Sequence, residues 1–492
     1  MNAYEQLCGL AQEIVLVGSA ASVLGWDQET YMPEKGLKQR ARQLSYLSAK
    51  AHELATGKRF RTLLEKAEKE EVTSGSTKAA NLREWRHEIE RASRIPTKMV
   101  AEESDVTSHA KHAWADARKR SDFSLFAPHL AKIVQLARKK ADLWGFSNEP
   151  YDALLTGYER GALTRDIAQL FGTLKPKVAQ IAQVAVERSS CVPKKLLHGK
   201  YPVLKQQQLN REIAESIGFD FDAGRIDTTT HPFCTTLGPA DVRLTTRYDE
   251  SDFTSSLFGV LHEVGHGLYE QGLPESDFGL PSGTAVSLGI HESQSRLWEN
   301  HVGRSLPFWE KWLPRAAELF PNLRKVELAD FMRAIHRAEF SFIRVEADEA
   351  TYDLHIMLRF EIERRLLAGT LEVNDVPKAW NESYAELFGQ TPPDDARGCL
   401  QDIHWSMGGL GYFATYTLGN LNSAQLFQCA QKVRSISAAT KRSDYGPLLV
   451  WLREKVHAKG STLFPGDLMV SATGKVTDSA PYLAHLRSRF TR

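Results

Sequence analysis

The sequence predicts a mainly α-helical protein with a small β-sheet beside one motif-bearing helix. Apolar residues recur at helical spacing, with charged residues between them, over 79–95 and 130–146. Residues 241–249, "DVRLTTRYD", alternate in polarity and carry Val and Thr, as a short strand does. No Ser/Gly-rich linker interrupts the 492 residues. We therefore expect a single large domain over 1–492.

The N-terminal stretch "MNAYEQLCGLAQEIVLVGSAAS" predicts a helix rather than a signal peptide. It has no basic leading region, and Glu5 and Glu13 interrupt its apolar residues. A membrane span needs roughly 18 consecutive apolar residues, and we expect none in this chain. The interpretation is an amphipathic helix and a protein without a membrane anchor.

Composition argues against two classes of partner and favours one compartment. The net charge is +1, which gives no electrostatic reason to bind nucleic acid or an acidic membrane surface. The five cysteines are few, odd in number and widely spaced, with no CxxC pair. This pattern is typical of reduced thiols, so we expect a cytoplasmic protein.

Two later segments complete the predicted architecture. Residues 331–369 form a long helical region that we expect to be broken once. The strand over 241–249 is expected to be an edge strand beside the motif-bearing helix, where it can pair with an extended peptide.

The motif HEVGH, 262–266, predicts a metallopeptidase site on a helix. Positions i and i+4 share a helix face, so His262 and His266 can hold one ion. Glu263 lies beside that face, where it can take a proton from the attacking water. His-Glu occurs four times in the chain, and only this pair has a second histidine at the required distance. The alternative is a buried helix with two hydrogen-bonded histidines.

A catalytic zinc needs a third protein ligand and an open position for water. Glu292 is favoured, because it lies on a second expected helix whose small neighbours allow another helix to approach closely. The alternative is a surface carboxylate paired with Arg296 at i+4. Three other downstream glutamates are weaker candidates for this ligand: Glu270, Glu275 and Glu299.

The chain resembles the carboxypeptidase Taq family of zinc metallocarboxypeptidases over nearly its whole length. The resemblance rests on motifs that occur in order: "GWDQETYMPEKG" at 25–36, "YDALLTGYERG" at 151–161, "HPF" at 231–233, "DVRLT" at 241–245, HEVGH at 262–266, "HESQSR" at 291–296, "IRVEAD" at 343–348 and "GCLQDIHW" at 398–405. The family's glutamate ligand falls on Glu292, in agreement with the spacing.

This resemblance implies a helical domain with a deep active-site cleft, similar to angiotensin-converting-enzyme and neurolysin-like folds. The N-terminal helices, about 1–150, would flank or lid that cleft. It also implies release of single C-terminal residues with broad specificity and little action on terminal proline. The expected cofactor is one zinc ion per chain, for which cobalt can substitute. The expected assembly is a homodimer.

Several further residues are assigned roles as hypotheses. His404 and Tyr412 are expected to stabilise the oxyanion, with Tyr412 favoured over Tyr416, which is assigned to substrate binding; core aromatics are the alternative. Four residues of HPF and DVRLT are expected to line the cleft: His231, Asp241, Arg243 and Thr245. Asp241–Arg243 is equally well interpreted as an ordinary ion pair.

An enzyme that removes C-terminal residues needs a group that binds the substrate's terminal carboxylate. Arg344 is the first choice, on a predicted helix, and Arg243 is the second. The alternative for Arg344 is a helix ion pair with Asp348. Asp348 and Asp402 are equally interpreted as supports of the site or as structural.

Two other functions use the same sequence features. An endopeptidase or a dipeptidyl carboxypeptidase on this scaffold would share every metal-binding residue. A peptide-binding protein without catalysis would have lost a ligand or the base, and neither is missing here.

Overall fold

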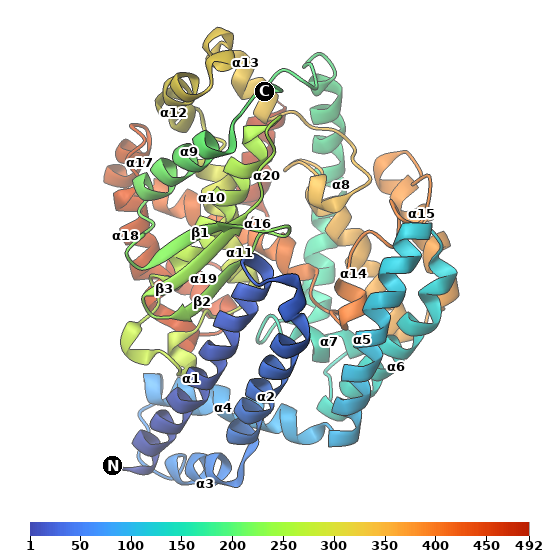
Figure 1. Cartoon of the computed structure of the whole chain (residues 1–492), viewed down its shortest axis with the longest axis vertical. Helices are drawn as coiled ribbons and strands as arrows, with labels where there is room; N and C mark the ends of the chain where they lie inside the picture. The colour runs from blue at the N-terminus through green and yellow to red at the C-terminus, as the bar shows by residue number, and fades with distance from the viewer. Residues whose placement is uncertain (492) are drawn as a thin grey trace. The chain divides into compact units, whose positions relative to one another are not determined.

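The computed structural model describes residues 1–491 and confirms the mainly helical fold with one small sheet (Figure 1). The described chain forms two compact units, each assembled from three separate stretches of sequence. Unit 1 comprises Met1–Ala92, Lys194–Ile335 and Asn422–Val476. Unit 2 comprises Ser93–Pro193, His336–Leu421 and Thr477–Arg492. The expected single domain and the lid formed by residues 1–150 stay predictions.

Unit 1 contains the sheet and most of the helices. Its helices are α1 (Ala3–Thr30), α2 (Leu37–Thr56), α3 (Lys58–Ala67), α9 (Val203–Ser216), α10 (Phe253–Glu270), α11 (Leu288–Arg296), α12 (Leu306–Leu319), α13 (Leu328–Ile335), α17 (Arg434–Thr440), α18 (Gly446–Lys455) and α19 (Pro465–Thr473).

The regular secondary structure of unit 2 is all helical in its described residues. Its helices are α5 (Thr97–Arg120), α6 (Ala127–Trp144), α7 (Pro150–Leu155), α8 (Thr164–Ser189), α14 (Tyr352–Ala368), α15 (Val376–Phe388) and α20 (Ala480–Phe490). Two helices cross a boundary between the units: α4 (Thr77–Arg94) and α16 (Ala414–Gln431).

The sheet has the strand order β1-β3-β2, so the predicted strand is at its centre. β3 (Asp241–Thr246) pairs in parallel with β1 (Gly224–Thr228) and antiparallel with β2 (Cys234–Gly238). The expectation of an edge strand over 241–249 is therefore wrong. The two flanking strands have five residues each, and neither was predicted from the sequence.

Helix α10 packs its apolar face into the main core of unit 1, beside β3 (Figure 1). Leu257, Leu261, Val264 and Leu268 are fully buried there. They meet Val242 and Leu244 of β3 and aromatic side chains of the following helices. This burial holds the helix that carries HEVGH on a rigid support.

Helix α1 corrects the expectation that no segment of the chain is long and apolar enough to span a membrane. A helix forms there, as predicted, but its 28 residues are long and apolar enough to cross a membrane by length and composition alone. Leu7 and Leu10 are buried in a small core with α3 and α4, whereas Leu16 is 67% exposed. Length and composition alone therefore do not distinguish this helix from a membrane span.

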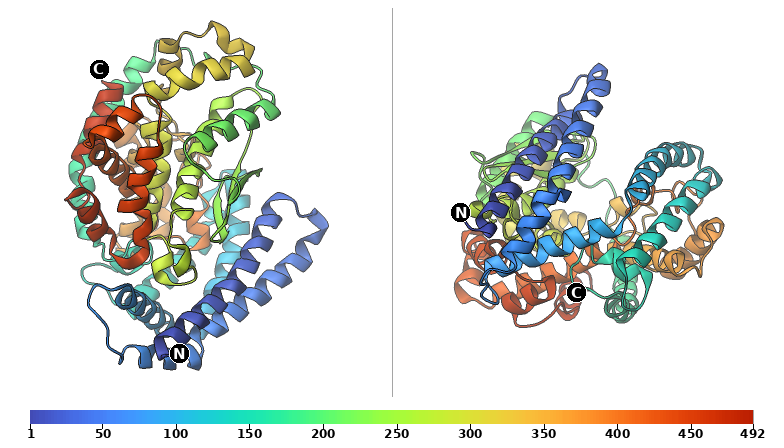
Figure 2. Two further views of the ribbon diagram at one scale, coloured as in Figure 1. Left: turned by 90° about the vertical axis from the view of Figure 1, so that its left-hand side faces the viewer. Right: turned by 90° about the horizontal axis from the view of Figure 1, so that it is seen from below.

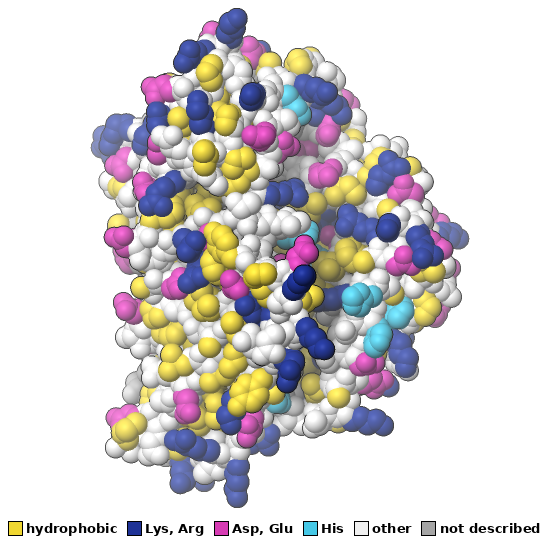
Figure 3. Space-filling model, viewed as in Figure 1, with side chains coloured by type: hydrophobic (Ala, Val, Ile, Leu, Met, Phe, Trp, Pro, Cys, Tyr) yellow, Lys and Arg dark blue, Asp and Glu magenta, His cyan; other side chains and the backbone are white. Residues whose placement is uncertain are grey.

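Helices α1 and α2 lie side by side as an antiparallel pair (Figure 2). No residue of α2 is buried. Leu37 and Tyr46 of α2 are exposed. Hydrophobic side chains are visible among the charged ones on the surface of the molecule (Figure 3).

The predicted long helix over 331–369 is interrupted more extensively than expected. Helix α13 ends at Ile335 and α14 begins at Tyr352, with only a single 3₁₀ turn, Arg344–Glu346, between them. Arg344 is therefore on a turn, and the expectation that it lies on a helix is wrong. Its side chain is held by tertiary contacts that the helical spacing of the sequence does not reveal.

Candidate active site

Helix α10 carries the two histidines and the glutamate of the HEVGH motif on one rigid element. Asp252 caps its start by accepting a hydrogen bond from the Thr254 amide at 2.9 Å. His262 and His266 follow on one face with their rings 5.0 Å apart, and Glu263 is only 7% exposed. The predicted helix is confirmed, and it gives the two histidines the spacing needed to bind one metal ion.

Helix α11 approaches α10 closely because the motif contains a glycine. A Cβ at Gly265 would lie 2.5 Å from the carbonyl oxygen of Gln294 and 2.5 Å from the Cα of Ser295. Small residues on the second helix were expected to allow this approach, and in the structure Gly265 of the first helix faces the backbone of Gln294 and Ser295. The approach brings Glu292 of α11 to the two histidines.

The donor atoms of His262, His266 and Glu292 lie within 4.8 Å of one another. Oε2 of Glu292 is 3.7 Å from Nε2 of His262 and 3.5 Å from Nε2 of His266. A tetrahedral ion with bonds of about 2.0–2.1 Å separates its ligand atoms by about 3.4 Å. The three side chains therefore fit a metal ion without rearrangement, and two nitrogens with one oxygen suit zinc chemistry.

The two carboxylate oxygens of Glu292 have different neighbours. Oε1 accepts a hydrogen bond from Arg296 Nε at 2.7 Å, and Oε2 faces the histidines. The carboxylate is buried, however, and not on the surface. Burial alone would raise the pKa of Glu292, but Arg296 and the two histidines hold it well below the ordinary value.

Glu263 and His266 have pKa values shifted by their surroundings. Burial raises the pKa of Glu263 to about 7. Burial, followed by the neighbouring His291, lowers the pKa of His266 to about 3. At neutral pH His266 is therefore an uncharged ligand, which is the form that binds a metal.

Glu299 and Glu270, considered as third ligands, have other partners. Glu299 lies in a π-helical segment, Leu297–Val302, that continues α11, and its Oε2 is 3.0 Å from Nδ1 of His262. Glu270 Oε1 is 2.8 Å from Nε2 of His291. Glu275, the remaining candidate, lies in a single turn after α10 that has no buried residue.

Arg344 is in unit 2, where it shares a carboxylate with a second arginine. Nη2 of Arg344 is 2.8 Å from Oδ1 of Asp402, and Nη2 of Arg359 is 2.6 Å from Oδ2. Nη1 of Arg344 donates to the hydroxyl of Tyr352 at 2.9 Å. All three charged groups are buried or nearly so.

The alternative pairing of Arg344 with Asp348 is wrong. Asp348 accepts hydrogen bonds from the amides of Glu339 and Ala350, at 3.0 and 2.9 Å, and thus stabilises the loop before α14. Its burial raises its pKa to about 6. An i+4 pair requires helical backbone between the two residues, and residues 347–349 are not helical.

His404, Tyr412 and Tyr416 lie in the same part of unit 2 as Arg344. The His404 and Tyr412 rings lie 5.3 Å apart, and Tyr412 and Tyr416 lie 5.2 Å apart. The Arg344 guanidinium lies 5.1 Å from the centre of the Tyr416 ring. Nδ1 of His404 is 3.9 Å from Oδ1 of Asp402. Arg344 is 60 or more positions from the other three residues in the sequence, so only folding brings it close to them.

The predicted residues of HPF and DVRLT are in unit 1, on β3 and the loop before β2. Arg243 binds Asp241 through two hydrogen bonds of 2.8 Å, as the ion-pair alternative states, and its guanidinium lies 4.2 Å from the Trp26 ring centre. Thr245 is fully buried, and its hydroxyl accepts from the Phe233 amide at 2.8 Å. Thr245 thus holds the loop that contains exposed His231.

The sequence analysis assigned no role to several residues that contact these groups. His291 touches a metal ligand, Arg359 shares Asp402, and Trp26 packs on Arg243. His291 lies directly before Glu292 in "HESQSR", which was the available signal. Trp26 lies in "GWDQETYMPEKG", a motif quoted without a role, and Arg359 has no local signal.

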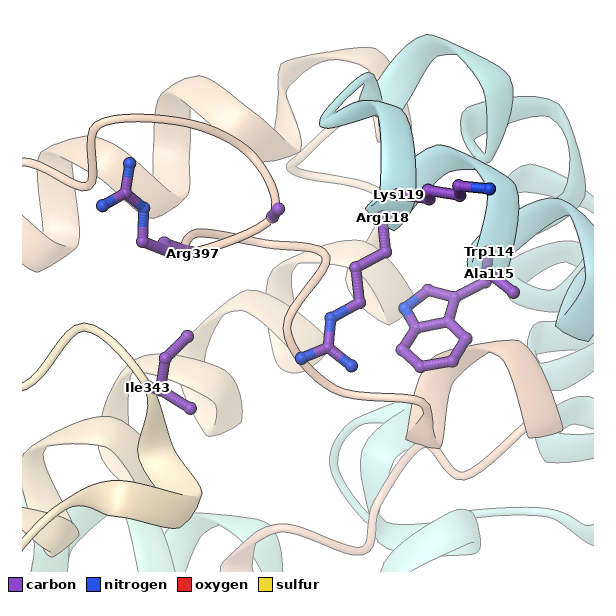
Figure 4. A pocket seen from close by; sticks show the side chains of 7 residues that line it. Trp114, Ala115, Arg118, Lys119, Ile343 and Arg397 are labelled. Carbon is purple, nitrogen blue, oxygen red and sulfur yellow. The ribbon is translucent and has the colours of Figure 1, made fainter.

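A pocket of about 460 Å³ lies in unit 2, lined by none of the predicted site residues. Arg118 extends from α5 along the Trp114 ring towards the loop that carries Ile343 (Figure 4). Lys119 and Arg397 also line it. Its exposed cations are open to solvent, which distinguishes it from the buried pair at Asp402.

The fold and the His-Glu-His-Glu arrangement define a helical metallopeptidase of the HExxH class. The chain belongs to the carboxypeptidase Taq (M32) metallopeptidase family, whose model matches residues 6–490. The expected resemblance is thereby confirmed, and the chain is a metallocarboxypeptidase.

Related proteins resemble the chain over its full length. Thermostable carboxypeptidase 1 of Thermus thermophilus is 42% identical over 99% of this chain and 98% of its own length. Carboxypeptidase 1 of Bacillus subtilis is 36% identical over 100% of this chain and 99% of its own. The crystal structure of the M32 carboxypeptidase from Deinococcus radiodurans R1 superimposes with a TM-score of 0.96 at 37% identity, covering 99% and 98% of the two chains.

Proposed function

We propose that this carboxypeptidase uses zinc, held by His262, His266 and Glu292, to release single residues from the C-terminus of peptides. The observation that supports the metal is the convergence of three ligand atoms within 4.8 Å. Zinc bound there supplies a Lewis acid that polarises the scissile carbonyl and lowers the pKa of water. Cobalt has similar ligand preferences and is expected to substitute.

Glu263 is the general base in this proposal. Its carboxyl group is buried beside the ligands, with a pKa raised to about 7, close to the operating pH of a good acid–base catalyst. It takes a proton from the attacking water and then transfers that proton to the leaving amine. His404 and Tyr412 are proposed as hydrogen-bond donors to the oxyanion.

Arg344 is proposed to bind the terminal carboxylate of the substrate. Arg344 and Arg359 face one shared carboxylate, Asp402, so their direct contacts leave one buried positive charge without a partner. The contacts with Asp402 and Tyr352 occupy three of the five N–H donors of Arg344. A peptide carboxylate would complete both the charge and the hydrogen bonding. Tyr416 is proposed to contact the same end of the substrate.

The remaining predicted binding residues, His231, Asp241, Arg243 and Thr245, are proposed to shape the substrate site from unit 1. Arg243 is the weaker anchor candidate, because Asp241 already accepts two of its N–H groups. A shared strand carries Asp241, Arg243 and Thr245, which supports a common role.

The experiment compares a free-acid peptide with its C-terminal amide on wild-type enzyme and on Arg344→Ala. Truncating one member of a buried charge pair costs about 2–5 kcal/mol, so kcat/KM should fall by roughly 30- to several-thousand-fold. Amidation should cause a similar loss with wild-type enzyme, and the two losses should not add, because both remove one contact.

Arg364→Ala is the matched control. Arg364 also lies in unit 2 and binds Glu149 through two hydrogen bonds of 2.9 Å, but it is assigned no substrate contact. It should leave the preference for the free acid unchanged. Equal cleavage of acid and amide, with larger fragments in the mass spectrum, would instead establish the endopeptidase or dipeptidyl carboxypeptidase alternative. Loss of the preference in Arg243→Ala alone would move the anchor to Arg243.

We also propose the broader properties that the family resemblance implies. Broad side-chain specificity and poor release of terminal proline are tested by mass spectrometry of a mixed peptide pool. A homodimer is tested by sedimentation equilibrium of the purified chain. The five cysteines are all unpaired thiols, which supports a cytoplasmic location, tested by cell fractionation.

A further inference from the structure

The two histidine ligands have different partners on the side away from the metal. Nδ1 of His262 meets a carboxylate directly, Oε2 of Glu299 at 3.0 Å. Nδ1 of His266 instead meets another imidazole, Nδ1 of His291, at 2.6 Å. Nε2 of His291 then meets Oε1 of Glu270 at 2.8 Å. One ligand is therefore supported directly and the other through an intermediate ring.

We propose that His291 and Glu270 are positioning residues that fix the tautomer and orientation of His266 for metal binding. This inference rests on the proposed metal site at His262, His266 and Glu292. It assigns functions to two side chains that neither bind the ion nor take part in the reaction. Glu270 lies two turns beyond His262 on α10, so it supports the site from the helix end.

With both imidazoles neutral, the proton positions along this chain have one consistent solution. An ionised Glu270 only accepts hydrogen bonds, so Nε2 of His291 must carry a hydrogen. In a neutral imidazole the other nitrogen is then an acceptor, so Nδ1 of His266 must donate to Nδ1 of His291. The lone pair of His266 is thereby left on Nε2, the atom 3.5 Å from Oε2 of Glu292. The opposite tautomer of His291 would leave a hydrogen on the ligand atom of His266.

The chain of contacts continues into the sheet, which restrains Glu270. Oε2 of Glu270 accepts a hydrogen bond from the Thr236 hydroxyl at 2.7 Å, and Thr236 belongs to β2. The ring of Tyr269 lies 5.4 Å from that of His291. Both Glu270 oxygens accept hydrogen bonds, and the His291 ring lies beside Tyr269. The His266 ring therefore cannot rotate about its Cβ–Cγ bond without breaking its hydrogen bond to His291. Such restraint slows the loss of a metal.

The test measures zinc affinity by competition with a chelator, zinc release rate, and the visible spectrum of the cobalt-substituted enzyme. Glu270→Ala should weaken zinc binding roughly 10–100-fold and speed its release, the usual effect of removing an outer partner of a ligand. Glu270→Gln keeps an acceptor oxygen for His291 and should retain most of the affinity. The change in the cobalt spectrum and the change in the zinc release rate should both be larger for Glu270→Ala than for Glu270→Gln.

Glu275→Gln is the matched control, an exposed-turn carboxylate near the end of the same helix. It should leave zinc affinity, release rate and the cobalt spectrum unchanged. Thermal unfolding of the metal-free proteins separates a folding defect from a metal defect, because a positioning role predicts similar apo midpoints and a smaller zinc-induced shift. Should Glu270→Ala not fold, Glu270→Gln and His291→Gln provide the comparison.

Two outcomes overturn different statements. If His291→Gln and Glu270→Ala bind and release zinc as wild type does, the positioning role is wrong. If Glu292→Ala keeps its zinc, the proposed ligand set itself is wrong. Loss of zinc in Glu292→Ala with unaltered Glu270 and His291 variants therefore rejects this inference and leaves the proposed function intact.

Discussion

The metal-ligand cluster of unit 1 and the arginine cluster of unit 2 differ in the chemical groups that they bring together. In unit 1, two imidazole nitrogens and one carboxylate oxygen converge within 4.8 Å with no donor between them. In unit 2, the guanidinium groups of Arg344 and Arg359 converge on the single carboxylate of Asp402. The first cluster presents converging lone pairs, and the second brings two positive charges to one negative charge.

This difference indicates what each cluster is built to bind. Burying like or unpaired charges is costly, so an incomplete buried cluster is stable only if its surroundings or a ligand compensate. Converging lone pairs fit a metal ion. Excess guanidinium donors fit a carboxylate, which every unmodified peptide carries at its C-terminus. These two properties support the proposed metal site and the proposed carboxylate anchor.

Removing a ligand breaks the metal cluster and should have the largest effect. Structural zinc sites bind with about 10–16 kcal/mol, so losing one of three protein ligands in Glu292→Ala should weaken zinc binding at least about a thousandfold. Zinc per chain after dialysis against a mild chelator measures this. The matched variant Glu275→Ala should stay fully loaded, and a loaded Glu292→Ala would assign the ligand elsewhere.

Neutralising the base should abolish turnover but leave the metal cluster complete. Glu263→Gln is nearly isosteric, and removing a positioned base usually costs roughly 10²–10⁴-fold in rate. We expect that loss in kcat with one zinc still bound per chain. Turnover near the wild-type rate would remove Glu263 from the mechanism, and loss of zinc would show that the residue holds the site together.

Replacing the carboxylate that Arg344 and Arg359 share should destabilise the arginine cluster. Asp402→Asn leaves Arg344 and Arg359 without their charge partner, and breaking such a buried pair costs about 3–5 kcal/mol. The free energy of unfolding in urea measures this cost. Asp394→Asn, which breaks the more exposed pair with Arg397, is the control and should cost under about 1 kcal/mol. Equal losses in the two variants would contradict the importance of the cluster.

Acid should have the smallest effect, through His404. Burial, together with Arg344 and Arg359, lowers the pKa of His404 to about 4, against an ordinary value near 6.5. The unfolded chain therefore binds a proton between pH 6.5 and 4 that the folded chain does not, so folding stability is lost as pH falls through this window. From pH 7 to 5 the loss is about 2 kcal/mol.

The His404→Gln variant isolates this contribution, because other groups also titrate in that range. The difference in unfolding free energy between pH 7 and 5 should be smaller in the variant than in wild type by about the same 2 kcal/mol. An identical pH dependence in the two proteins would mean that His404 is protonated as easily in the folded state as in the unfolded one.

Local patterns in the sequence were sufficient for the helix that carries the motif. The 3.6-residue period of α10, its cap at Asp252 and the i, i+4 spacing of His262 and His266 all act within one helix, so they can be recognised without tertiary information. Glu292 was found in the same way, as a carboxylate on the next helix. Its alternative pairing with Arg296 is also local, and both contacts exist.

Non-local contacts were not predictable from the same patterns. The alternative for Arg344 was an ion pair with Asp348 four residues along a helix, but its charged partner Asp402 is 58 positions away. The strand over 241–249 became the centre of the sheet because two five-residue strands flank it. The contribution of Gly265 to the close approach of α11 was not predicted, because a glycine's role depends on which backbone it faces.

The sequence by itself determined the helical class, the HEVGH helix and the candidate metal ligands, since these depend on the spacing of residues within single elements. Only the tertiary structure decided that Glu299 and His291 would support the two histidines, and that Arg344 would share Asp402 with Arg359. A buried polar group must find a partner somewhere in the fold. Sequence identifies the group, but the partner depends on how distant segments pack.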